Sequence, residues 1–147
     1  MKNVLVCAFM CLAFASTGFA QFRKTPQAVL DAFRKKYPNA EEVCWKSKDR
    51  GFQANFHLMG VAFEASFSEK GYWQQCAQDI LPESVPGDVK YGVEKTEYKE
   101  WIVKEATFIV GPAEKTEYRL LLFKNAVQQM YLFFNPNGDL RETRASK

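Results

Sequence analysis

The feature that most constrains the fold is an internal repeat. Aligning the sequence with itself pairs residues at spacings of 56, then 66, then 67 positions. Because the spacing grows by about ten residues after the second tryptophan, we predict two tandem units, about 24–79 and 80–147, the second of which carries an insertion. The paired positions are Pro26, Val29, Phe33 and Trp45 with Pro82, Val85, Val89 and Trp101; Phe52, Ala54 and Phe56 with Tyr118, Leu120 and Leu122; and Phe67 and Gly71 with Phe134 and Gly138.

Each unit has the pattern of a helix followed by strands. In the first unit, Thr25 and Pro26 predict a helix start, and apolar residues at helical spacing continue to Tyr37. Alternating apolar residues with period two then predict four strands joined by short turns that contain glycine. Short turns join antiparallel neighbours, so we expect a meander. The four strands are expected at 43–45, 52–58, 61–67 and around Trp73.

The second unit repeats this order less clearly. A helix is expected within 82–93, but Pro86 and Gly87 interrupt it and predict only one or two turns. Strands are expected at 101–110, 118–124 and 127–135, with a short one after Gly138. We therefore predict an α+β fold with one twisted antiparallel sheet of about eight strands, its helices on one face and its other face open to water.

The first twenty residues have the pattern of an export signal. A basic start at Lys2 precedes an apolar run from Val4 to Ala15, and small residues lead to a predicted cleavage after Ala20. An uncleaved anchor is the alternative, although an apolar run of this length is too short to span a bilayer. We expect a signal peptide at 1–20 and one domain at 21–147 that is periplasmic or secreted, soluble and free of the membrane.

Composition excludes several kinds of partner and chemistry. With 47% hydrophobic and 25% charged residues, the chain is typical of a globular domain. Its net charge of +3 is dispersed along the sequence, which does not favour nucleic acid as a partner. No glycine-rich phosphate loop follows a predicted strand.

His57 is the only histidine, and it decides several hypotheses about catalysis. On its predicted strand the neighbours are Asn55 and Ala62, and neither is a nucleophile. One histidine with two separated cysteines does not provide a zinc site. We therefore predict a solvated histidine, no catalytic residue, no metal, no cofactor and no enzymatic activity.

Two cysteines, Cys44 and Cys76, remain after the predicted cleavage. In a meander they lie on the first and fourth strands, roughly 14 Å apart at about 4.8 Å per strand. A disulfide requires Cα atoms within about 7 Å. We predict two free thiols, and only a different strand order would change this.

A series consisting mainly of apolar, proline, glycine and aromatic positions runs through most of the mature chain and is densest from Pro26 to Val85. Its residues are Pro26, Ala28, Val29, Ala32, Phe33, Tyr37, Pro38, Ala40, Val43, Trp45, Ala54, Phe56, Glu64, Ala65, Phe67, Gly71, Trp73, Leu81, Pro82 and Val85. This series resembles that of PepSY-like, β-lactamase-inhibitor-protein-like secreted proteins. The resemblance implies a tandem helix-plus-four-strand architecture, a periplasmic or secreted location and no catalytic residues. The inhibitor relatives carry disulfides within each unit, which this chain lacks, so the resemblance does not transfer a binding mode.

The open sheet face is the remaining candidate for a functional surface. In the second unit the predicted register places Leu121, Phe123, Tyr131 and Phe133 on this face, which is unusually apolar for a solvated surface. Contiguous exposed aromatics mark interaction sites, so these four residues are our predicted partner-binding site. Cover by the insertion around 111–116 or by a helix of a dimer partner is the alternative.

The leading functional hypothesis is an exported binding module that contacts, and inhibits or modulates, a periplasmic protein. The alternative is a carrier of a small hydrophobic or signalling ligand held between sheet and helices. A homodimer is left open by the sequence.

Overall fold

A computed structural model describes residues 23–146. The predicted signal peptide and its cleavage site lie outside the described residues. The chain forms one eight-stranded antiparallel sheet in the order β1 to β8, so every strand pairs with its neighbours in sequence. The predicted α+β class, with two successive units of a helix and four strands, is confirmed. The elements are α1 (Gln27–Lys36), β1 (Glu41–Lys48), β2 (Gly51–Leu58), β3 (Val61–Ser68), β4 (Trp73–Ile80), the 3₁₀ turn η1 (Pro82–Ser84), α2 (Gly87–Glu94), β5 (Ile102–Val110), η2 (Pro112–Glu114), β6 (Thr116–Asn125), β7 (Gln128–Phe134) and β8 (Leu140–Ala145).

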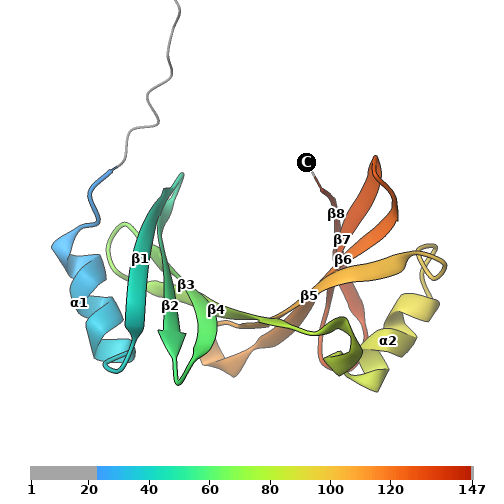
Figure 1. Ribbon diagram of the computed structural model, residues 1–147, viewed down its shortest axis with the longest axis horizontal. Coiled ribbons are helices and arrows are strands. Elements are labelled where there is room, and N and C mark those ends of the chain that lie inside the picture. The colour runs from blue at the N-terminus through green and yellow to red at the C-terminus, as the bar shows by residue number, and fades with distance from the viewer. Residues whose placement is uncertain (1–22, 147) are drawn as a thin grey trace, which may run out of the picture.

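The sheet is strongly curved, and both helices lie on its outer side. Figure 1 shows β1–β3 and α1 at one end and β5–β8 and α2 at the other, with β4 crossing between them. The face away from the helices is concave and looks into the space between the two ends. Twist accumulates along a sheet of this many strands, and the helices packed on one face make the other face the inner one.

Register in the first half follows from a tight turn. Met59 (φ 49°) and Gly60 (φ 78°) are both left-handed, as a two-residue hairpin turn with right-handed strand twist requires. This turn sets Leu58 opposite Val61. The predicted pairings Phe56 with Phe63 and Ala54 with Ala65 are likewise confirmed.

Each helix packs on its own hydrophobic core. Phe33 of α1 meets Trp45, Phe56 and Phe67 edge-on, with ring centroids 5.1–6.1 Å apart. Full burial of one such side chain stabilises the fold by about 1.5–3 kcal/mol. The two cores comprise Val29, Phe33, Phe52, Ala54, Phe56, Ala65 and Phe67 under α1, and Val85, Val89, Val93, Ala106, Leu120, Leu122, Leu132 and Phe134 under α2.

The second helix begins later than predicted. Pro86 does not interrupt it but stands at its N-terminal boundary, where a missing N–H costs nothing, and α2 runs from Gly87 to Glu94. Pro26 stands at the same position before α1. The helices therefore repeat at a spacing of 60 residues (26 to 86), and the predicted spacing of 56 is wrong for this part of the unit.

The two tryptophans paired by sequence are consequently not equivalent. Trp45 lies within β1 opposite Ala54, whereas Trp101 precedes β5 and packs against Tyr98. The position corresponding to Trp45 is Ala106, opposite Leu120. The spacing is 61 for Trp45 and Ala106 and 66 for Ala54 and Leu120, so most of the extra residues of the second unit lie between β5 and β6.

A glycine in the third turn of each unit touches the start of its helix. Gly71 and Gly138 are both left-handed (φ 87° and 81°). A Cβ added at Gly71 would lie 2.7 Å from the carbonyl oxygen of Ala28, and one at Gly138 would lie 2.0 Å from that of Asp88. Turn and helix backbone thus meet without an intervening side chain, which explains why the repeat keeps glycine at both positions.

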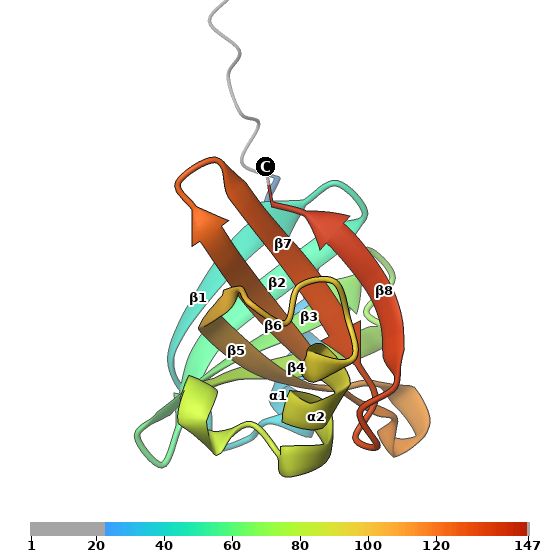
Figure 2. The same cartoon turned by 90° about the vertical axis from the view of Figure 1, so that its right-hand side faces the viewer.

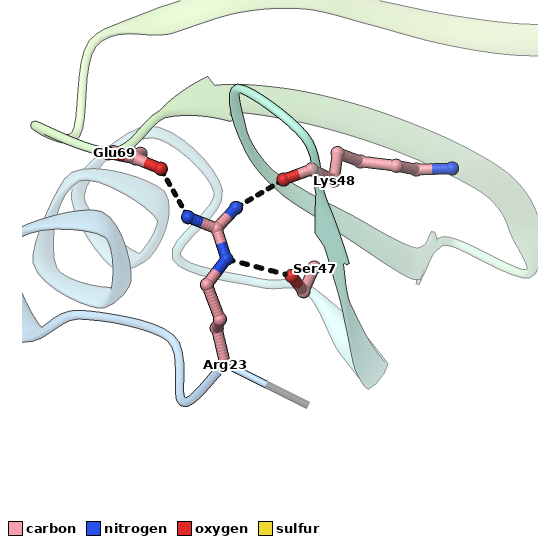
Figure 3. Close-up of polar contacts among 4 residues, drawn as sticks. All are labelled: Arg23, Ser47, Lys48 and Glu69. Carbon is pink, nitrogen blue, oxygen red and sulfur yellow. Dashed lines mark hydrogen bonds and ion pairs between the residues drawn. The ribbon is translucent and has the colours of Figure 1, made fainter. Parts of the chain in front are cut away.

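Arg23 ties the start of the described chain to two turns of the first unit (Figure 3). Its guanidinium pairs with Glu69 and donates to the carbonyl oxygen of Lys48 and to the hydroxyl of Ser47. The same guanidinium lies 5.3 Å from the ring centre of Phe52, a core residue. Arg23 therefore covers the end of the core that faces the β1–β2 and β3–β4 turns.

Both cysteines are free, as predicted. Cys44 pairs with Asn55 on the concave face, whereas Cys76 pairs with Ala65 and packs against the core under α1. The two thiols are therefore on opposite faces as well as three strands apart. Across residues 23–146, no helix is long and apolar enough to cross a membrane.

We predict that alanine at Gly138 or Gly71 destabilises the fold strongly. Each substitution adds a backbone clash to the strain of a left-handed residue, and we expect a loss of more than about 3 kcal/mol in the free energy of unfolding. Gly60→Ala is the matched control, because Gly60 is also left-handed but a Cβ there meets nothing within 4 Å. Denaturant unfolding should show a loss of about 1–2 kcal/mol for the control. Equal losses in the variants and the control would contradict the proposed contact.

Candidate functional site

The concave face is formed by alternate residues of all eight strands. Strand register sets Asn55 beside Glu64, Glu64 beside Ala77, Asp79 beside Thr107, and Thr107 beside Arg119. The row continues from Arg119 to Phe133 and then to Glu142. Polar groups therefore occupy the half formed by β1–β4, and arginine and aromatic groups occupy the half formed by β6–β8.

A hollow of about 450 Å³ opens in the polar half. Glu42, Glu64 and Asp79 line it, and so do Phe56 and Phe63 of β2 and β3, whose side chains belong to the core under α1. Its remaining lining is Cys44, Asn55, His57, Ala62, Ala77 and Arg119. The hollow thus joins the two units, since Arg119 belongs to β6 and the other groups to β1–β4.

A bulge in β1 brings Glu42 to His57. The ladder shifts register between Glu41 and Cys44, and Glu42 takes a left-handed conformation (φ 52°). The shift places Oε2 of Glu42 3.0 Å from Nδ1 of His57. The contact lacks hydrogen-bond geometry, because Nδ1 has no hydrogen-bond partner within the described residues, and it is an ion pair only while the imidazole is protonated. His57 is partly exposed, as predicted, and its acidic neighbour was not predicted from the sequence.

Three side chains form a hydrogen-bonded chain across the junction of the two units. The hydroxyl of Thr107 donates to Oδ1 of Asp79 at 2.9 Å and accepts from the Arg119 guanidinium at 3.2 Å. Thr107 is only 4% exposed, so these bonds are shielded from water. The sequence analysis missed Asp79 and Thr107, because the register between β4 and β5 is set across α2 and not by a short turn.

Arginines cover the aromatic half of the face. Arg119 stacks 5.6 Å from the ring centre of Tyr131, and Arg144 stacks 5.1 Å from that of Phe133. Guanidinium groups stack on aromatic rings through cation–π attraction. The rings are therefore held in place by charged groups that themselves face the concave side.

The predicted exposure of the partner-binding residues is correct for only two of the four. Leu121 and Phe133 are buried, at 4% and 8% exposure, and the Arg144 guanidinium covers the Phe133 ring. Phe123 and Tyr131 are partly exposed. The expected open apolar patch is corrected to a mixed surface, and partner binding by these residues stays a prediction.

Glu117 lies toward the β5–β6 loop at one end of the aromatic half. Burial, together with the nearby Glu142 carboxylate, raises the pKa of its carboxyl, while Arg119, Arg141 and Arg144 act in the opposite direction. On the helix side, burial raises the pKa of Tyr37, whose hydroxyl accepts from Nε1 of Trp73 at 3.0 Å. Neither group has a catalytic partner in the described chain.

The arrangement is suited to recognition. Within residues 23–146, no three His, Cys, Asp or Glu side chains converge as metal ligands. Cys44 and His57 share the hollow, although strand neighbours alone did not suggest it. What the face presents is ordered charge, hydrogen-bonding groups and aromatic surface.

The sequence matches no family model and no curated protein. Solved structures nevertheless share the fold. A DUF2874 family protein from Bacteroides uniformis superposes with a TM-score of 0.75 at 22% identity, over 83% of this chain and 90% of that one. A BLIP-like protein from Bacteroides fragilis gives 0.72 at 23% identity, over 85% and 89%. A protein from Bacteroides eggerthii, assigned provisionally to the periplasm, gives 0.73 at 21% identity, over 84% and 90%.

At these identities the likeness shows the fold alone. The predicted resemblance to BLIP-like proteins is confirmed at that level, and none of the comparisons supports the PepSY part of the prediction. None of the three neighbours is named for an enzymatic activity.

We predict that Thr107→Val lowers the free energy of unfolding by about 1–3 kcal/mol, because the Asp79 carboxylate and the Arg119 guanidinium each lose a shielded partner. Thr107→Ser keeps the hydroxyl and is the matched control, losing only a methyl group at about 1 kcal/mol. Denaturant unfolding of both variants measures the difference. A valine variant as stable as the serine variant would show that the hydrogen-bonded chain contributes nothing.

Proposed function

We propose that this chain is an exported, non-enzymatic binding protein that holds a protein partner on its concave face. One observation carries the proposal: side chains of this face are already fixed by contacts within the chain. Arg119, for example, is held by Thr107 and stacked on Tyr131. Preorganised side chains lose little conformational entropy on binding, so their contacts contribute more to affinity.

The chemistry of the face suits a protein partner. Tyrosine and arginine are the residues most enriched where interfaces bury their centre, and both stand at the aromatic half. The adjoining hollow carries three carboxylates, which favour a partner with basic side chains. A protruding loop that carries a basic residue beside apolar ones fits both halves.

The fold neighbours support a location and a role of this kind. One is a BLIP-like protein, and one is assigned provisionally to the periplasm. Together with the predicted signal peptide, they favour a periplasmic binding protein that inhibits or modulates its partner.

The carrier alternative places its ligand between the sheet and the helices, where core side chains already lie. Phe56, Phe67 and Phe134 are at most 2% exposed and fill the space between sheet and helices in the described chain. A small ligand between the layers would have to displace them, at the cost of about 3–5 kcal/mol seen when such a side chain is removed.

Alanine substitution of Tyr131 tests the proposal. Affinity capture from the periplasm identifies proteins held by the wild-type chain, and calorimetry with the purified candidate then measures its affinity. We expect Tyr131→Ala to weaken binding at least about tenfold, as the loss of an interface anchor does. Phe123→Ala should act in the same direction.

Tyr91→Ala is the matched control for this experiment. Tyr91 is an exposed tyrosine of α2, on the outer side, and it too carries a stacked cation, Lys95 at 4.1 Å. The control should bind like the wild type. Equal binding by Tyr131→Ala and Tyr91→Ala, with both variants folded by circular dichroism, would reject the concave face as the binding surface.

A further inference from the structure

The last strand, β8, ends the sheet with an open edge. Among residues 23–146 it pairs only with β7, and all six of its residues are exposed. Figure 2 shows β8 at the border of the sheet, with no other strand on its outer side. An exposed edge of this kind is a template for another strand.

Backbone alternation fixes which groups of β8 point outward. The N–H of Ser146 donates to the carbonyl oxygen of Gln129 in β7 at 3.2 Å. Because alternate residues of a strand point to opposite sides, Arg144 and Glu142 also bond to β7. The N–H and C=O groups of Thr143 and Ala145 therefore point away from the sheet, and the alternation is interrupted at Arg141, where the register shifts.

The side chains of β8 are complementary to themselves when the strand is reversed. Glu142 and Arg144 flank Thr143 symmetrically, and both lie on the concave face. In an antiparallel pair centred on Thr143, each Glu142 lies opposite Arg144 of the second copy, and the two threonines face each other. Opposite charges and paired threonines each stabilise such neighbours by about 0.2–1 kcal/mol.

We propose that β8 pairs with β8 of a second copy of this chain, antiparallel and with the two-fold axis at Thr143, which joins the two sheets into one. This register is consistent with the backbone geometry. The outward-pointing N–H and C=O groups of Thr143 in one copy face those of Thr143 in the other, and the two residues exchange two hydrogen bonds. Self-pairing uses the backbone edge of β8, whereas the proposed partner binding uses the rings of the concave face, and either proposal stands without the other.

The opposite edge of the sheet is less suited to pairing. Both edge strands carry a register shift, at Glu42 in β1 and between Leu140 and Glu142 in β8. The regular part of β8, residues 142–145, carries a carboxylate and a guanidinium on either side of Thr143, whereas the regular part of β1, residues 44–48, carries lysines and no carboxylate to pair with them in a second copy. The structure therefore assigns self-association to β8 and not to β1.

An interface of one edge strand is small, so the dimer is weak and must be tested at high concentration. Light scattering of the purified chain, taken up to about 1 mM, should show the mass rise toward that of two copies, as for a dissociation constant below about 1 mM. A mass of one chain throughout overturns the proposal.

Thr143→Pro removes the outward N–H at the centre of the interface. The fold tolerates this change, because proline is accepted on an edge strand where the N–H faces solvent. The variant should remain a monomer at every concentration while thermal unfolding shows that it is folded. A folded variant that still dimerises overturns the proposal.

Charge exchange tests the register without touching the backbone. Glu142→Arg places like charges opposite each other and should weaken the dimer at least about tenfold. Adding Arg144→Glu to this variant exchanges the two charges and should restore association, since each pair is again opposite in sign. Failure of the double variant to recover overturns the register centred on Thr143.

A cysteine trap locates the two-fold axis directly. In a background of Cys44→Ser and Cys76→Ser, Thr143→Cys brings two sulfurs together, because Cα atoms of a hydrogen-bonded pair lie about 5.5 Å apart, within disulfide range. Mild oxidation should then give a covalent dimer. Arg141→Cys and Ala145→Cys, each made alone, are controls that should not cross-link, since position 141 faces position 145 of the other copy.

Discussion

The contact between a left-handed glycine and the first turn of a helix is the constraint on which the rest of this structure depends. It occurs once in each unit, between Gly71 and Ala28 and between Gly138 and Asp88. The contact is backbone to backbone, so it fixes how closely the helix approaches the turn. Fixing both helices on the same side determines which face of every strand is buried, and it leaves the opposite face to become the concave one.

Local sequence predicted the first unit well, because short turns carry their own register. Met59 and Gly60 can form only a tight hairpin, and the pairing of Leu58 with Val61 follows from it without tertiary information. The second unit was predicted less well at its start. Its sequence pattern predicts Pro86 as a helix breaker, whereas proline also suits the beginning of a helix, and only the equivalence with Pro26 distinguishes the two roles.

The candidate site was harder to predict than the fold, because its key contacts cross a long connection. Asp79 and Thr107 are neighbours only through the pairing of β4 with β5, and α2 lies between these strands in the chain. The alternation of residues placed Phe133 on the correct face, but alternation carries no information on what covers a side chain. That cover comes from Arg144, on a strand whose register the sequence alone did not fix.

Arg144 connects the two surfaces proposed for this protein. It stacks on Phe133 within the concave face and also pairs with Glu142 along β8, with Nη2 2.6 Å from Oε1. In the edge-paired dimer the same guanidinium gains a second carboxylate, which draws it toward the two-fold axis. The stacked position over Phe133 and the pairing across the axis then compete for one side chain. Self-association therefore changes the aromatic half of the concave face by moving its charged cover, with no rearrangement of the strands.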